Sequence, residues 1–129
     1  MTSPEVVTMP DVEAWVWAAI NSIPGVTSFC YATVHGWPLW LAAYSIQVDA
    51  RAQTKEAARD RAEQARQIIC ALQGQSWPDG VCNSARPVEG PFWLPDNDAG
   101  PRYCARYEIH AHPAPSGPAA PMAAARAAR

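Results

Sequence analysis

The sequence predicts an α+β fold: two helices packed on one face of a mostly antiparallel four-stranded sheet, in the order α-β-β-α-β-β. Two segments carry apolar residues at helical spacing, and two others alternate apolar and polar residues as half-covered strands do. A length of 129 residues fits one domain. We expect this domain to span residues 1–112 and to be followed by a Pro/Ala-rich tail over residues 113–129, whose composition cannot form a core.

The first predicted helix begins near Thr8. As the cap, Thr8 would place Pro10 and Asp11 in the first turn, where a missing N–H is harmless and a negative charge favours the helix dipole. Its apolar face consists of Val12, Trp15, Val16, Ala19, Ile20 and Ile23. The helix should end at Pro24. Trp17 lies off this face, so it either packs against the next element or contacts another subunit.

A hairpin of two strands is expected next. Residues 26–34 are rich in β-branched and aromatic side chains, residues 36–38 break the chain, and a longer strand runs from Leu39 to about Arg51. In its second half, Tyr44, Ile46, Val48 and Ala50 alternate with Ser45, Gln47, Asp49 and Arg51. This alternation is typical of a sheet covered on one side, whose polar face is free for solvent or partners.

The second predicted helix runs from Thr54 to about Leu72. Its inward stripe of mostly small residues allows a close approach to the sheet. The stripe consists of Ala58, Ala62, Ala65, Ile69 and Leu72. The opposite face carries charges of mixed sign at spacings of three and four, which indicates an ordinary solvated surface.

The last part of the domain should contain two more strands. After a turn at WPDG, the stretch VCNSARPVEG fits an edge strand because Pro87 cannot donate a ladder hydrogen bond. The segment PFWLPDNDAGP is then expected to be a loop. The final strand, RYCARYEIHAH, alternates strictly. Its apolar positions are Tyr103, Ala105, Tyr107, Ile109 and Ala111.

Charge and composition argue against several function classes. A formal net charge of −2 is unlike the basic footprint of proteins that grip nucleic-acid phosphates. Glu5, Asp11 and Glu13 occupy the region where a signal peptide or membrane anchor would be uncharged, so synthesis in the cytoplasm without membrane insertion is expected. The four cysteines form no CxxC pair and are expected to be structural thiols.

The best catalytic or metal candidates are His110 and His112, which a strand places on one side together with Cys104 and Glu108. A strand spaces such residues by roughly 7 Å, so only two neighbours could share an ion. The DNDAG segment lacks the later ligands of a calcium loop and is expected to be a polar turn. The sequence therefore predicts no metal, no cofactor and no catalytic residues, and a small metal or thiol enzyme remains a distant alternative.

Three aromatic and proline-containing loops are the most distinctive feature. They contain Trp37 with Pro38, Trp77 with Pro78, and Phe92 and Trp93 with Pro95. Each could fold back onto the core. Together they offer more rigid apolar surface than a monomer needs, and aromatic anchors are enriched where proteins meet.

Two longer segments resemble the tail terminator proteins of siphophages, especially those of phages that infect actinobacteria. YSIQVDARAQTKEAARDRAEQAR is similar to that family's strand and alanine-rich helix. GPFWLPDNDAGPRYCARYEIHAHP is similar to its closing hairpin. With the first helix, these segments cover most of residues 9–113.

The resemblance implies a virion protein, assembled in the host cytoplasm, that forms a hexameric ring on the end of the tail tube. Such a ring stops tube polymerisation, joins the head connector proteins and lets genomic DNA pass without specific binding. A head-to-tail stopper or another neck protein is the nearest alternative. The residues expected to contact a neighbouring subunit or the tube are Trp17, Phe92, Trp93, Pro95, Pro113 and Pro115, with the tail crossing an adjacent subunit.

Overall fold

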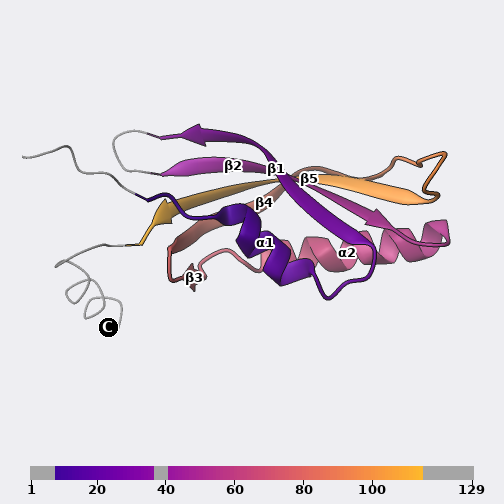
Figure 1. Cartoon of the computed structure of the whole chain (residues 1–129), viewed down its shortest axis with the longest axis horizontal. Coiled ribbons are helices and arrows are strands. Elements are labelled where there is room, and N and C mark those ends of the chain that lie inside the picture. The colour runs from indigo at the N-terminus through magenta and orange to yellow at the C-terminus, as the bar shows by residue number, and fades with distance from the viewer. Residues whose placement is uncertain (1–7, 37–40, 115–129) are drawn as a thin grey trace, which may run out of the picture.

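The computed structural model describes residues 8–36 and 41–114 and shows an α+β domain with both helices on one face of a curled antiparallel sheet (Figure 1). The elements are α1 (Val12–Ile20), β1 (Val26–His35), β2 (Ala42–Arg51), α2 (Lys55–Cys70), β3 (Ser76–Trp77), β4 (Gly80–Trp93) and β5 (Arg102–Pro113). The strands lie in the order β1-β2-β5-β4-β3. The predicted fold class is confirmed, although the sheet has five strands rather than four.

The fifth strand comes from the WPDG turn. Ser76 and Trp77 pair with Val81 and Gly80, so the turn closes a short hairpin between β3 and β4. Trp77 stacks on Trp15 of α1, with ring centroids 4.2 Å apart. Two residues are too short to show the alternation by which a strand is recognised in sequence, and for this reason β3 was not predicted.

Helix α1 starts later than predicted. Asp11, not Thr8, is its cap: the Asp11 Oδ1 atom accepts a hydrogen bond from the Ala14 N–H at 3.0 Å. Asp and Thr are both good caps. Because the helix begins at Val12, the N–H group that a cap must satisfy is that of Ala14, and Asp11 lies three residues before it. The helix ends at Ile20, four residues before Pro24. Of the predicted apolar face, all members are buried except Ala19, which is half-buried.

Helix α2 begins as predicted, with the Thr54 Oγ1 atom accepting from the Ala57 N–H at 3.2 Å. It ends at Cys70, and Leu72 follows in a turn but is still buried. The alanines of its inward stripe are buried, and the helix contacts β2, β4 and β5. Small side chains therefore bring this helix close to the middle of the sheet.

The predicted alternation of the two central strands is confirmed. In β2, Tyr44, Ile46, Val48 and Ala50 are buried; in β5, Ala105, Tyr107, Ile109 and Ala111 are buried. The alternation fails at one end of the pair, where Tyr103 is only half-buried and Asp49 and Cys104 of the opposite face are buried. Every residue of β2 pairs with one of β5, from Ala42 with Ala111 to Arg51 with Arg102. The structure describes β2 from Ala42, with Leu41 before the strand, whereas the predicted residues 39 and 40 lie outside the described residues, as do Trp37 and Pro38.

Strand β4 is longer than predicted, and it includes three predicted loop residues, Pro91, Phe92 and Trp93. Phe92 and Trp93 are its last residues and pair with Cys104 and Tyr103. The strand continues past Pro87 and Pro91 because it shifts register against β5 at three places, which absorb residues that do not fit a regular ladder. On the side of β4 that faces away from β5, only Gly80 and Val81 are paired, with β3. The rest of that side is an edge among the described residues, which agrees with the edge position predicted for Pro87.

The end of β5 lies one residue beyond the predicted domain boundary. Pro113 is the last residue of this strand and pairs with Gly80. Pro115 and the rest of the tail lie outside the described residues, so the predicted contact of the tail with a neighbouring subunit stays a prediction. Within residues 8–36 and 41–114, no helix is long and apolar enough to cross a membrane.

Candidate interaction surfaces

The uncovered face of the sheet carries a layer of charged and polar pairs. Arg106 contacts Glu89 at 3.0 Å, and Arg86 contacts Glu108 at 3.2 Å, each pair bridging β5 and β4. All four side chains are at least 30% exposed, so each pair contributes at most about 1 kcal/mol. The layer makes this face polar, and no helix within residues 8–36 and 41–114 covers it.

The two histidines lie on this face, as predicted, but each has a partner of its own. His110 Nδ1 lies 2.9 Å from the Ser84 hydroxyl, and His112 Nδ1 lies 2.7 Å from the Asn83 side-chain oxygen. Both partners come from β4. In the described part of the chain, no three histidine, cysteine or acidic side chains come together as a metal site would require.

Cys104, the third candidate of the enzyme alternative, is buried beneath this face and is only 1% exposed. Burial raises the pKa of its thiol to about 11, and the neighbouring carboxylate of Asp49 acts in the same direction. A thiol with such a pKa is protonated at neutral pH and is a poor nucleophile. The position of Cys104 is that of a packing residue.

Ser84, His110 and Glu108 form a chain of contacts that the sequence did not predict. The Glu108 carboxylate lies 3.4 Å from His110 Nε2, on the other side of the ring from Ser84. A hydroxyl, an imidazole and a carboxylate in this order can relay a proton. Glu108 is also held by Arg86, however, and neither of the two surface hollows described below reaches these residues.

Apart from Trp17 of α1, the large apolar side chains that are exposed in the described residues form two separate groups at opposite edges of the sheet. The first, the β1 edge patch, consists of Phe29, Tyr31 and Val34. The second, the β4 edge patch, consists of Val88, Trp93 and Leu94. Strand β1 is the first strand of the sheet, and β4 has an open edge on the far side. The sequence did not single out Phe29, Tyr31, Val34, Val88 or Leu94. It predicted an edge position for the strand around Pro87, but it did not show which side chains of an edge strand are exposed.

The β1 edge patch is ordered by aromatic contacts. Phe29 and Tyr31 meet edge to face with centroids 6.4 Å apart, and the Arg106 guanidinium lies 5.8 Å from the centre of the Tyr31 ring. Val34 extends beyond them and is 68% exposed. Aromatic side chains held in this way lose little further freedom when a partner covers them.

Among the predicted contact residues, Trp93 belongs to the β4 edge patch. It is 38% exposed, packs against Tyr103 with centroids 5.4 Å apart, and has the Lys55 ammonium 4.9 Å from its ring centre. Phe92 is half-buried, and Pro95 is exposed in the following loop. These three neighbours therefore lie at one end of β4.

Trp17 lies apart from that group. It is on α1, which packs against β1, and it is 59% exposed. Trp17 is thus more than half exposed, and its remaining surface lies beside Ser28 of β1, so neither of the two predicted alternatives is decided. A shallow hollow beside it, the α1 hollow, is lined by Asp11, Glu13, Ala14, Trp17 and Ser28.

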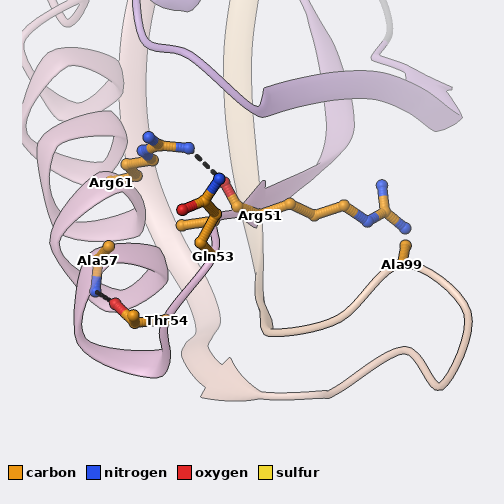
Figure 2. A pocket seen from close by; sticks show the side chains of 7 residues that line it. Arg51, Gln53, Thr54, Ala57, Arg61 and Ala99 are labelled. Carbon is orange, nitrogen blue, oxygen red and sulfur yellow. Dashed lines mark hydrogen bonds between the residues drawn. The ribbon is translucent and has the colours of Figure 1, made fainter.

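A larger hollow lies where β2 meets the start of α2 (Figure 2). It is lined by Arg51, Ala52, Gln53, Thr54, Ala57, Arg61 and Ala99. Arg61 Nη1 donates to the Arg51 carbonyl at 2.7 Å, and the Arg51 guanidinium contacts Asp96 at 3.4 Å. Arg61 therefore joins α2 to β2, and Arg51 joins β2 to the following loop at Asp96. Each of the two arginines thus already has a partner among the described residues.

Asp96 also stabilises the loop between β4 and β5. Its carboxylate accepts hydrogen bonds from the N–H groups of Asp98 and Ala99, which hold the pKa of Asp96 below its ordinary value. The DNDAG segment is thus a polar turn closed on itself, as predicted, with Asp96 and Gly100 paired across it.

Comparison with known proteins identifies no family for this chain. The sequence matches no protein-family model, and no curated protein shows significant similarity to it.

Proposed function

We propose that the chain is a structural virion protein, a tail terminator that forms a ring on the end of a phage tail tube, stops tube polymerisation and offers a joining surface to the head connector. The observation that carries this proposal is the separation of exposed apolar side chains into the β1 edge patch and the β4 edge patch. No catalytic role is assigned to any residue.

Two different patches on one subunit suit a ring. A cyclic assembly with more than two copies needs head-to-tail contacts, in which one patch of each subunit meets a different patch of the next. A dimer with two-fold symmetry needs only one. The two groups at opposite edges of a curled sheet support the cyclic arrangement, and the hexameric number comes from the resemblance to tail terminators.

The segments that carry the resemblance occupy coherent parts of the fold. Residues 44–66 cover most of β2 and the first three quarters of α2, and residues 90–113 cover the end of β4, the loop and all of β5. Trp93, Phe92 and Pro95 lie in the second segment, and we assign them to the contact with a ring or tube neighbour. The net charge of −2 suits a channel that DNA passes without binding.

The nearest alternative is a head-to-tail stopper or another neck protein, which would use the same two patches in a different place in the particle. The distant alternative, a metal or thiol enzyme, would use His110, His112 and Cys104. The separate partners of the two histidines and the raised pKa of the Cys104 thiol favour a structural role for all three.

The proposal is tested by light scattering of the purified protein, alone and after mixing with phage tail-tube protein. We expect a hexamer in solution or on the tube, and tubes whose length is fixed by addition of the protein. A stable monomer that leaves tube growth unchanged would contradict the terminator function and move the assignment to a neck protein.

A further inference from the structure

Ser84, His110 and Glu108 bring a hydroxyl, an imidazole and a carboxylate together on the polar face of the sheet. The Ser84 hydroxyl lies 2.9 Å from His110 Nδ1, and the Glu108 carboxylate lies 3.4 Å from His110 Nε2. When the hydroxyl donates to Nδ1, the ring proton is on Nε2 and points to Glu108. The hydroxyl is then bonded to a base, and the base is oriented by a carboxylate, as nucleophilic catalysis requires.

The register of β4 and β5 adds a cation to this arrangement. Ser84 pairs with His110 and Arg86 pairs with Glu108, so the four side chains project from the same face. The Arg86 guanidinium contacts Glu108 at 3.2 Å and is 67% exposed. Among the described residues only its Nη2 group has an acceptor. Its other N–H groups can therefore hydrogen-bond an oxyanion that forms beside Ser84, roughly 7 Å away along the strand.

The three groups are open to small molecules. Ser84 is half-buried, and the side chains of His110 and Glu108 are 28% and 30% exposed. Neither of the two hollows described above includes them. A substrate thus approaches over the face of the sheet, and without walls to hold a long chain the site suits a small acyl group on a good leaving group.

We propose that Ser84 and His110 transfer the acyl group of a small activated ester to water. The Ser84 oxygen attacks the ester carbonyl carbon while its proton moves to His110 Nδ1. The bond from that carbon to the leaving oxygen breaks, and the leaving group takes the proton from Nδ1. Water then attacks the acyl carbon, gives a proton to Nδ1 and releases the acid, and the Ser84 oxygen regains the proton. Glu108 is the positioning residue that stabilises the charged ring.

This activity goes beyond the structural function proposed above. Its residues belong to neither the β1 edge patch nor the β4 edge patch. Substitutions that abolish acyl transfer should therefore leave ring formation and capping of tail tubes unchanged, and a failure of either proposal does not decide the other.

The test is the reaction of the purified full chain with p-nitrophenyl acetate. Release of p-nitrophenolate measures the rate, and peptide mass spectrometry of quenched samples locates the acetyl group. We expect an acetyl group on Ser84 that is absent in Ser84→Ala. His110→Gln should slow acetylation of Ser84 by about 100-fold or more. Glu108→Ala should slow it less, and Glu108→Gln, which still accepts the ring N–H, should recover part of that loss.

Two matched controls lie on the same face. Ser45 is half-buried like Ser84 and pairs with Glu108 from the side of β2. His112 is bonded to an asparagine rather than to a serine. Ser45→Ala and His112→Gln should both react as the wild type does. Equal rates of acetylation in the wild type and in Ser84→Ala, or acetyl groups only on amines such as that of Lys55, would overturn the proposal.

Discussion

The two faces of β5 differ in what they contribute. Towards the helices, Tyr107 and Ile109 are at most 1% exposed and belong to one continuous core. Towards solvent, Glu108 and His110 form polar contacts with β4 on an uncovered surface. Neighbouring residues of one strand thus belong either to a packed interior or to an open layer. The packing that stabilises the domain is therefore concentrated on one face of the sheet.

The largest effect expected from this comparison is the loss of a core side chain. Ile109→Ala should lower the free energy of unfolding by about 2–5 kcal/mol, because it removes buried apolar atoms and leaves a cavity in the core. Glu108→Ala, one residue away on the other face, should cost no more than about 1 kcal/mol. Chemical denaturation of the two variants measures both values. Equal losses would show that the open face is as important for stability as the core.

A smaller effect is expected at Asp79, which joins the β3–β4 turn to α1. Burial opposes the charged form of this carboxyl, but the hydrogen bonds from the Asp11 N–H and the Trp15 indole outweigh it and hold the pKa of Asp79 below its ordinary value. Asp79→Ala should therefore lower the free energy of unfolding by about 1–2 kcal/mol near neutral pH, since the group is only partly buried.

The pH dependence follows from the sign of that shift. A depressed pKa means that the folded state favours the carboxylate, so the stabilisation is present above the ordinary aspartate pKa and is lost as pH falls through the lower folded value. The difference between wild type and Asp79→Ala in denaturation experiments should thus be constant near pH 7 and shrink below about pH 4. A difference that grows on acidification would contradict this assignment.

How much the sequence predicted depends on whether local patterns decide the outcome. The start of α2 at Thr54 and the alternation of β2 and β5 depend on nearby residues, and both were correct. The length of β4 was not predicted, because Pro87 and Pro91 look like strand breakers. Only the register shifts against β5 show how the strand continues through them.

The candidate surfaces were predicted in part for the same reason. Trp17 and Trp93 stand out in sequence because both are large and fall outside the predicted core stripes. Val34 and Val88 look like ordinary strand residues. Pro87 predicted an edge position for the strand of Val88, but only the order β1-β2-β5-β4-β3 places Val34 at an edge. Similarly, the contact between Ser84 and His110 depends on the register of two strands that are 26 residues apart in sequence.

The smallest effect on stability, and the sharpest test of assembly, is expected at the two edges. Val34 and Val88 are 68% and 64% exposed, so Val34→Asp and Val88→Asp should each change the free energy of unfolding by only about 0.5 kcal/mol. Each should nevertheless prevent ring formation and capping of tail tubes, because each places a charge in one of the two edge patches. Gln64→Asp, which adds the same charge on the exposed side of α2, should assemble as the wild type does.

Mixing the two variants distinguishes a ring from a two-fold dimer. In a head-to-tail contact, the intact β4 edge patch of Val34→Asp can still meet the intact β1 edge patch of Val88→Asp, so a 1:1 mixture should form a dimer and nothing larger. Analytical ultracentrifugation of each variant and of the mixture measures this. If one variant alone associates as the wild type does, only one patch is used, and the contact is a symmetric one that cannot build a ring.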